Sequence, residues 1–233
     1  MSQLASSFEH VETWVFDLDN TLYQARHRLF DQIDERMGSF IASRFSVDRA
    51  EARRIQKDYF YRYGTTLRGL MSEHGVKPNE FLDFVHNIDH SVLPADEVLA
   101  AALDKLEGRK LIFTNGTVAH AESVLRATGI AGRFDDIFDI EASDYEPKPA
   151  AEPYRKFIAE TGFDPNSAAM FEDIARNLEV PHELGMVTVL VADTDNEDGA
   201  LINHLNGDAE GAPYVHHVTD NLGAFLHQLL VQS

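Results

Sequence analysis

Two carboxylates stand two residues apart directly after the first apolar run of the chain. Trp14-Val15-Phe16 leads into Asp17-Leu18-Asp19-Asn20-Thr21. Carboxylates this close repel each other, and a bound cation removes the repulsion. Their hard oxygen atoms suit Mg²⁺, and a carboxylate can also attack phosphorus to form an acyl phosphate. Taken alone, the pattern is more often an acidic turn that caps a helix.

Three further polar clusters follow later apolar runs. Thr114-Asn115-Gly116 offers a hydroxyl, an amide and a flexible backbone that can donate to phosphate oxygens. Lys148 stands between two prolines that restrict its backbone, so its ammonium group could offset phosphate charge beside Asp17. Glu172-Asp173 could complete a Mg²⁺ site. Each cluster alone has an ordinary explanation as a turn, a surface lysine or a helix cap, but the ordered set indicates phosphoryl transfer.

The elements that must position these clusters form a strand–helix alternation. Apolar runs predict strands at Trp14–Phe16, Lys110–Thr114, Ile137–Ile140, Ala168–Phe171 and Val187–Val191, with Tyr214–Val218 as a sixth. Helical patterns between them cover Glu97–Leu106, Val118–Thr128, Pro153–Thr161 and Asn177–Leu184. This alternation predicts an α/β fold with a doubly wound parallel sheet. Ligands of such sheets bind at the carboxyl ends of the strands, where all four polar clusters fall.

Residues 24–90 interrupt this rhythm with helical patterns alone, which predicts a helical insert over the carboxyl edge of the sheet. The predicted division is therefore a core of residues 1–23 and 91–233 with a cap of residues 24–90. Residues 24–90 contain 11 Lys/Arg and 10 Asp/Glu, whereas the rest of the chain contains 9 and 29. A different function for the two parts, or drift in surface composition, explains this difference equally well.

Composition excludes several classes of protein. The chain has 233 residues, 44% of them apolar, and a net charge of −19, which disfavours a polymeric nucleic-acid partner. No cysteine is present, which excludes thiolate chemistry and fits a cytoplasmic location. Residues 1–16 lack the pattern of a signal peptide, and no apolar run approaches membrane-spanning length. Thr194–Asp208 is polar and acidic and predicts a loop or a frayed helix.

With these motifs in place, the chain resembles a haloacid dehalogenase (HAD) superfamily hydrolase, with a Rossmann-like core and an inserted helical cap. The resemblance implies that Asp17 is the nucleophile and a Mg²⁺ ligand. It implies that Asp19 is the general acid and base and binds Mg²⁺ through its backbone carbonyl. It assigns phosphate binding to Thr114, Asn115 and Lys148, and the remaining metal ligands to Asp173 and Glu172. Asn177 departs from the acid that many relatives carry near this position.

Within the superfamily, three segments resemble pyrimidine 5'-nucleotidase-type enzymes: residues 16–23, residues 63–70 and residues 171–178. The resemblance implies a small phosphate monoester as substrate, with a nucleoside 5'-monophosphate as the first candidate. We expect the cap to select the substrate, with Tyr61, Arg62 and Arg68 as candidate specificity residues and Arg26 and Arg28 as further candidates. Ordinary helix packing is the competing explanation for the aromatic residues.

Three alternatives remain open from the sequence. Another small ester, such as phosphoglycolate or a sugar phosphate, would use the same core chemistry. A 2-haloacid dehalogenase would share the nucleophile, although Asp19 and Glu172-Asp173 speak against it. A non-catalytic binding protein would need none of these groups. For the phosphatase mechanism, Asp19 must start protonated, so we expect its pKa to be raised by Asp17.

Overall fold

The computed structural model describes residues 3–192 and 211–232, so the segment Thr194–Asp208 lies outside the described residues. Six strands form one parallel sheet in the order β3-β2-β1-β4-β5-β6. Their bounds are β1 (Thr13–Phe16), β2 (Arg109–Phe113), β3 (Asp136–Phe138), β4 (Ala168–Glu172), β5 (Val187–Val191) and β6 (His217–Thr219). The predicted fold class is confirmed. The first five predicted strands differ from the observed ones only at their ends, whereas the sixth, Tyr214–Val218, shares only two residues with β6.

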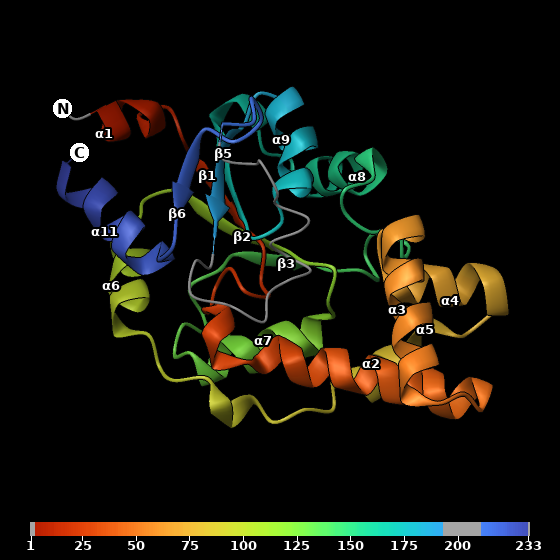
Figure 1. Cartoon of the computed structure of the whole chain (residues 1–233). Helices are drawn as coiled ribbons and strands as arrows, with labels where there is room; N and C mark the ends of the chain where they lie inside the picture. Colours follow the sequence, from red (N-terminus) through yellow and green to blue (C-terminus); the bar gives the residue numbers. More distant parts are fainter. Residues whose placement is uncertain (1–2, 193–210, 233) are drawn as a thin grey trace.

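Helices cover both faces of the sheet because successive side chains of a buried strand point to opposite sides (Figure 1). Trp14 and Phe16 pack into a cluster with α6, α7 and α11, while Val15 packs into a second cluster with α8. The helices of this part are α1 (Gln3–Phe8), α6 (Glu97–Lys105), α7 (Val118–Ala127), α8 (Ala151–Thr161), α9 (Glu179–Glu183) and α11 (Leu222–Gln232). Four short 3-10 turns are η1 (Ala25–His27), η2 (His90–Val92), η3 (Pro165–Ser167) and η4 (Ala175–Leu178).

The helix predicted over Asn177–Leu184 is divided between η4 and α9. Pro181 has no N–H with which to bond the carbonyl of Asn177, so a regular helix cannot run through this segment. The hydroxyl of Tyr154 donates to that carbonyl instead, at 2.6 Å. The consequence is a tight turn immediately after β4, beside the carboxylates of Glu172 and Asp173.

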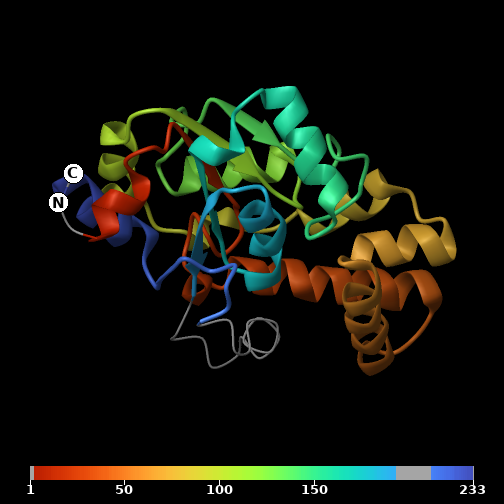
Figure 2. The same ribbon diagram turned by 90° about the horizontal axis from the view of Figure 1, so that it is seen from above.

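Four helices make up the insert: α2 (Leu29–Phe45), α3 (Arg49–Tyr63), α4 (Thr66–His74) and α5 (Pro78–Val85). Side-chain caps fix where two of them begin, because Asp48 accepts from the N–H of Glu51 and Thr65 from that of Arg68. The four helices bury a hydrophobic cluster of their own, to which the core contributes Ile140. Figures 1 and 2 show α2 running out from the sheet toward α3, α4 and α5, which are grouped to one side.

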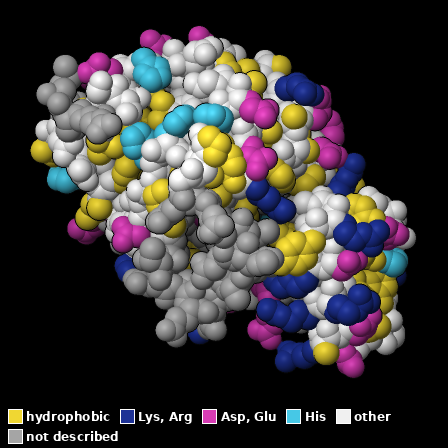
Figure 3. Space-filling view, turned by 45° about the horizontal axis from the view of Figure 1, so that its top comes forward, with side chains coloured by type: hydrophobic (Ala, Val, Ile, Leu, Met, Phe, Trp, Pro, Cys, Tyr) yellow, Lys and Arg dark blue, Asp and Glu magenta, His cyan; other side chains and the backbone are white. Residues whose placement is uncertain are grey.

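The basic side chains are distributed according to the same division between core and insert. In the space-filling view of Figure 3, Lys and Arg side chains gather on the side of the molecule that the insert occupies. In the described residues, no helix is both long and apolar enough to cross a bilayer.

Candidate active site

Three carboxylates and one ammonium group meet at the carboxyl ends of β1 and β4. Oxygen atoms of Asp17, Glu172 and Asp173 lie within 4.8 Å of one another, and all three side chains are buried. Lys148, only 2% exposed, reaches the cluster from the loop after β3. With every group ionised the cluster would carry two unbalanced negative charges. Because such a charge is costly away from water, the cluster favours taking up a proton or a cation.

The titration of the carboxylates reflects this imbalance. Burial raises the pKa of Asp17 to about 7, with Glu172 adding to the rise and Lys148 opposing it. Burial, together with the charges of Glu172 and Asp17, raises the pKa of Asp173 well above its usual range. The cluster therefore holds protons near neutral pH that a bound divalent cation would displace.

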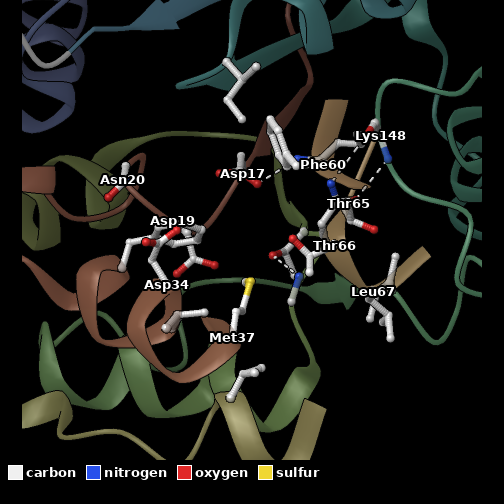
Figure 4. Close-up of a pocket in the computed structure, with 18 of the residues that line it drawn as sticks. Asp17, Asp19, Asn20, Asp34, Met37, Phe60, Thr65, Thr66, Leu67 and Lys148 are labelled. Atoms are coloured by element: carbon white, nitrogen blue, oxygen red, sulfur yellow. Dashed lines mark hydrogen bonds and ion pairs between the residues drawn. The ribbon is translucent and has the colours of Figure 1, made fainter. Parts of the chain in front are cut away.

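Lys148 uses all three of its N–H groups inside the protein. Its Nζ lies 2.7 Å from Oδ1 of Asp17 (Figure 4), 2.7 Å from Oε1 of Glu172 and 2.8 Å from the carbonyl oxygen of Phe113. An ammonium group has three donors, so none is left for a phosphate oxygen in this arrangement. Burial lowers the pKa of Lys148, but the charges of Asp17 and Glu172 outweigh it and raise the pKa overall. Lys148 is therefore a fixed cation beside Asp17.

Glu172 is occupied mainly by protein donors. Its Oε1 accepts from Lys148 and, at 2.7 Å, from Nδ2 of Asn177, and its Oε2 accepts from the N–H of Ile174 at 2.8 Å. With these bonds, Glu172 is better suited to hold Lys148 in place than to bind a cation. Asn177, where many relatives carry an acid, thus contacts Glu172 through its amide nitrogen.

The donor set fits a hard divalent cation. It consists of buried oxygen atoms carrying excess negative charge, which is the environment that Mg²⁺ prefers. In addition, Oδ1 of Asn177 is buried, and in the described part of the chain it has no hydrogen-bond partner. Nδ2 of Asn20 donates to Oδ2 of Asp173 at 3.3 Å and orients that carboxylate. Asp17 and Asp173 are the residues best placed to hold the ion.

Thr114 and Asn115 follow β2 beside the same cluster. Oγ1 of Thr114 accepts from the N–H of Gly116 at 2.9 Å, which leaves the hydroxyl proton to donate to a ligand. The Asn115 amide instead pairs with the backbone of Lys148, accepting from its N–H at 3.0 Å and donating to its carbonyl at 3.5 Å. The side chain of Asn115 therefore fixes the loop that carries Lys148.

The pKa expected for Asp19 is wrong. Burial alone would raise it, but His120 and Tyr23 outweigh burial and lower the pKa of Asp19 below its usual value. Nε2 of His120 lies 2.8 Å from Oδ1 of Asp19, and the Tyr23 hydroxyl donates to the same oxygen at 2.7 Å. Asp17, not Asp19, has the raised pKa. Without substrate, Asp19 is thus ionised and would take up a proton when a phosphate anion lies beside it.

A pocket of about 160 Å³ opens from these groups toward the insert (Figure 4). Helices α2 to α5 line most of its far end with apolar side chains, among them Ile33, Met37, Phe60, Leu67, Phe81 and Val85. Its polar lining from the insert comprises Asp34, Gln56, Lys57, Thr65, Thr66 and His86. Nε2 of Gln56 donates to Oδ1 of Asp34 at 2.8 Å, and Nζ of Lys57 lies 3.0 Å from the same oxygen. The pocket thus joins a charged end at the strands to an apolar end that carries one amide and one ion pair.

The candidate specificity residues lie elsewhere. Tyr61 is 49% exposed, Arg62 pairs with Asp58 at 3.1 Å, and Arg68 pairs with Glu146 at 2.7 Å. Tyr61, Arg62 and Arg68 do not line this pocket, and neither do Arg26 and Arg28. Their role in substrate selection therefore stays a prediction that the lining of this pocket does not support. The aromatic run of α3 turns Phe60 inward instead, because adjacent helical residues point about 100° apart.

Sequence reasoning also missed Tyr23 and His120, which bind Asp19. Tyr23 stands four residues after Asp19, and His120 stands one turn into the helix after Thr114. A titratable side chain so close behind two of the motifs is the signal that could have identified them.

A family model matches most of the chain. The model of the haloacid dehalogenase-like hydrolase family matches residues 11–185. A curated relative is phosphate metabolism protein 8 of Saccharomyces cerevisiae, 28% identical over 138 residues. That alignment covers 54% of this chain and 42% of the yeast protein, so it spans less than half of the relative's length.

Solved structures share the whole fold. A HAD phosphatase from Thermococcus onnurineus is 16% identical with a TM-score of 0.60, covering 94% of this chain and 96% of that one. The L-2-haloacid dehalogenase from Xanthobacter autotrophicus, with chloropropionic acid covalently bound, is 15% identical with a TM-score of 0.57, covering 96% and 99%. A phosphatase and a dehalogenase are thus about equally similar in shape, and the fold does not choose between their reactions.

Proposed function

The chain belongs to the haloacid dehalogenase-like hydrolase family, and from this premise we propose that it is a Mg²⁺-dependent phosphomonoester hydrolase. The observation that carries the proposal is the buried cluster of Asp17, Glu172 and Asp173 around Lys148. A dehalogenase needs no cation and no second acid, so a negative cluster with Asp19 beside it favours attack on phosphorus. The name of the yeast relative, a phosphate metabolism protein, points the same way.

In the proposed mechanism, a carboxylate oxygen of Asp17 attacks phosphorus in line, and the bond from phosphorus to the ester oxygen breaks. Asp19 gives its proton to the leaving oxygen and then removes a proton from water. That water attacks phosphorus, the acyl phosphate bond breaks, and phosphate leaves while Asp17 is restored. Lys148 offsets developing charge from its fixed position, and the Thr114 hydroxyl donates to a phosphate oxygen. A bound Mg²⁺ would further neutralise the phosphate oxygens and would be held by Asp17, Asp173 and the carbonyl of Asp19.

We propose that residues 24–90 act as the cap and that a nucleoside 5'-monophosphate, first of all a pyrimidine nucleotide, is the substrate. Two features of the pocket support this choice. Phe60 offers an aromatic face for a base, and Gln56 with Lys57 offers hydrogen-bonding groups for its polar edge. Phosphoglycolate and sugar phosphates remain alternatives because they would use the same strand-end chemistry.

The test is a phosphate-release screen of UMP, CMP, dTMP, AMP, GMP, phosphoglycolate and sugar phosphates, each with Mg²⁺ and with a chelator. The proposal requires turnover that depends on Mg²⁺ and prefers the pyrimidine nucleotides. Preference for another ester would retain the phosphatase but replace the substrate. A parallel incubation with L-2-chloropropionate tests for dehalogenase activity. Halide release that persists in the presence of a chelator would establish a dehalogenase instead.

A further inference from the structure

We infer that His120 is a positioning residue for Asp19, holding its carboxylate in the orientation from which it protonates the leaving group. The inference rests on the proposed function, since it presumes that Asp19 is the general acid and base. It is supported by two neighbouring side chains, which both bind the same carboxylate oxygen of Asp19.

Both donors use the same oxygen atom. Nε2 of His120 lies 2.8 Å from Oδ1 of Asp19, and the hydroxyl of Tyr23 lies 2.7 Å from it. The other oxygen, Oδ2, faces the loop after β2, since a methyl group placed on Gly116 would come within 3.7 Å of it. Rotation of an aspartate carboxylate about its last torsion has broad minima, so hydrogen bonds must fix it. His120 and Tyr23 thus keep Oδ2 on the side where Thr114 would receive phosphate.

The imidazole of His120 is itself held rigidly. Its side chain is fully buried, and it stacks on the ring of His86 with centroids 4.5 Å apart and planes 6° from parallel. Its Nδ1 lies 3.3 Å from Nε2 of His90. One consistent set of protons has His90 donating to Nδ1 and His120 donating from Nε2 to Asp19. Each ring in this row then orients the next.

Two of the three histidine rings in this row, those of His86 and His90, come from one segment of the chain. His86 directly follows α5 as its C-cap, and His90 begins η2, so both belong to the segment by which the insert returns to the core. Oγ1 of Thr117, the residue that caps α7, lies 3.2 Å from Nδ1 of His86. The two nitrogens of His120 thus link this segment to the acid, since Nδ1 faces His90 and Nε2 faces Asp19. The return segment therefore orients the acid through His120.

The experiment compares kcat/KM for 4-nitrophenyl phosphate with kcat/KM for an alkyl phosphate. A nitrophenolate leaves without a proton, whereas an alkoxide needs one, so only the second reaction reports the acid. We expect His120→Phe to lower kcat/KM about 10²-fold for the alkyl ester and only a few-fold for the aryl ester, since general acid catalysis contributes at least that factor. His120→Gln, whose amide nitrogen can replace Nε2, should recover most of the loss. Tyr23→Phe should show the same selectivity with a smaller effect, and it serves if His120→Phe fails to fold.

Equal losses on both esters, or a glutamine variant no better than phenylalanine, would overturn the inference. Asp19→Asn is the reference: if it shows no selective loss on the alkyl ester, the assignment of Asp19 fails rather than that of His120. Thermal stabilisation by Mg²⁺ is the second readout. It should be the same in His120→Phe as in the unsubstituted protein, and its loss would mean that His120 supports the cation site instead.

Discussion

Nζ of Lys148 lies 2.7 Å from Oδ1 of Asp17, inside a cluster in which carboxylates outnumber cations by three to one. This contact joins two residues 131 positions apart in the chain. It favours the ionised form of a carboxylate whose pKa burial raises. The predictions below test this contact, the charge balance around it and the pocket that it faces.

Replacing Asp17 by asparagine should abolish turnover while leaving the fold intact. The amide cannot form the acyl phosphate, and loss of a nucleophile costs about 10⁴-fold or more in rate. Phosphate release under single-turnover conditions and a circular dichroism spectrum are the two measurements. Substantial residual activity in a well-folded variant would show that another group attacks phosphorus.

Replacing Lys148 by methionine should destabilise the protein strongly at about pH 8. Removing one partner of a buried ion pair costs about 3–5 kcal/mol, because the remaining charges lose their compensation. Lys156→Met is a matched control, since Lys156 pairs at 2.7 Å with Asp144, whose side chain is 85% exposed. Urea unfolding should show a clear loss for the first variant and little change for the second. Equal effects would mean that the buried contact is no stronger than a surface one.

The metal-free protein should lose stability as the pH rises from about 4 to about 7. Asp17 has a raised pKa of about 7 in the folded state against 3.8 for an ordinary aspartate. Between these values the unfolded chain releases a proton that the folded protein keeps, so folding becomes less favourable with rising pH. Mg²⁺ binds the ionised form, so its stabilising effect should grow over the same range.

Unfolding free energies with and without Mg²⁺, measured near pH 5 and pH 8, check this prediction. Asp17→Asn is the control, because it removes one of the two carboxylates with a raised pKa and should weaken the pH dependence of the metal-free protein, while Asp173 continues to titrate. A Mg²⁺ effect that is the same at both pH values would contradict the assignment of Asp17 as a ligand.

Replacing Phe60 by alanine should raise KM for the preferred substrate about tenfold, equivalent to about 1.4 kcal/mol of lost contact. Phe60 lines the pocket, whereas its neighbour Tyr61 is half exposed and does not. Tyr61→Ala is therefore the matched control and should leave KM and substrate preference unchanged. If the tyrosine variant showed the larger effect, substrate would bind outside the pocket described above.

Replacing Gly69 by alanine should destabilise the insert. A methyl group there would lie 2.4 Å from Cβ of Tyr59, so α3 and α4 could not keep their present approach. Overpacking of this kind costs about 1–3 kcal/mol. Gly38→Ala in α2 is the control, since its methyl group would meet nothing closer than 3.5 Å and should be tolerated. If unfolding curves showed Gly38→Ala to be less stable than Gly69→Ala, this explanation of the packing would be wrong.

Local chemistry in the sequence determined the fold class and the position of the motifs. Runs such as Val187–Val191 are apolar except for one threonine, and this pattern is typical of strands covered on both sides. Polar motifs directly after such runs must then lie along one edge of a parallel sheet. These inferences need only the period of a strand and the direction of the chain, both of which a sequence contains.

The tertiary structure alone decided which titratable groups face each other. The sequence places Asp17 beside Asp19 and so suggested that Asp17 raises the pKa of Asp19. In space, His120 and Tyr23 bind Asp19, while Glu172 and burial act on Asp17. The sequence also could not predict which residues line the pocket. Whether Phe60 or Tyr61 points inward depends on how α3 is rotated against its neighbours. Electrostatic energies and side-chain directions depend on distances through space, which separation along the chain does not fix.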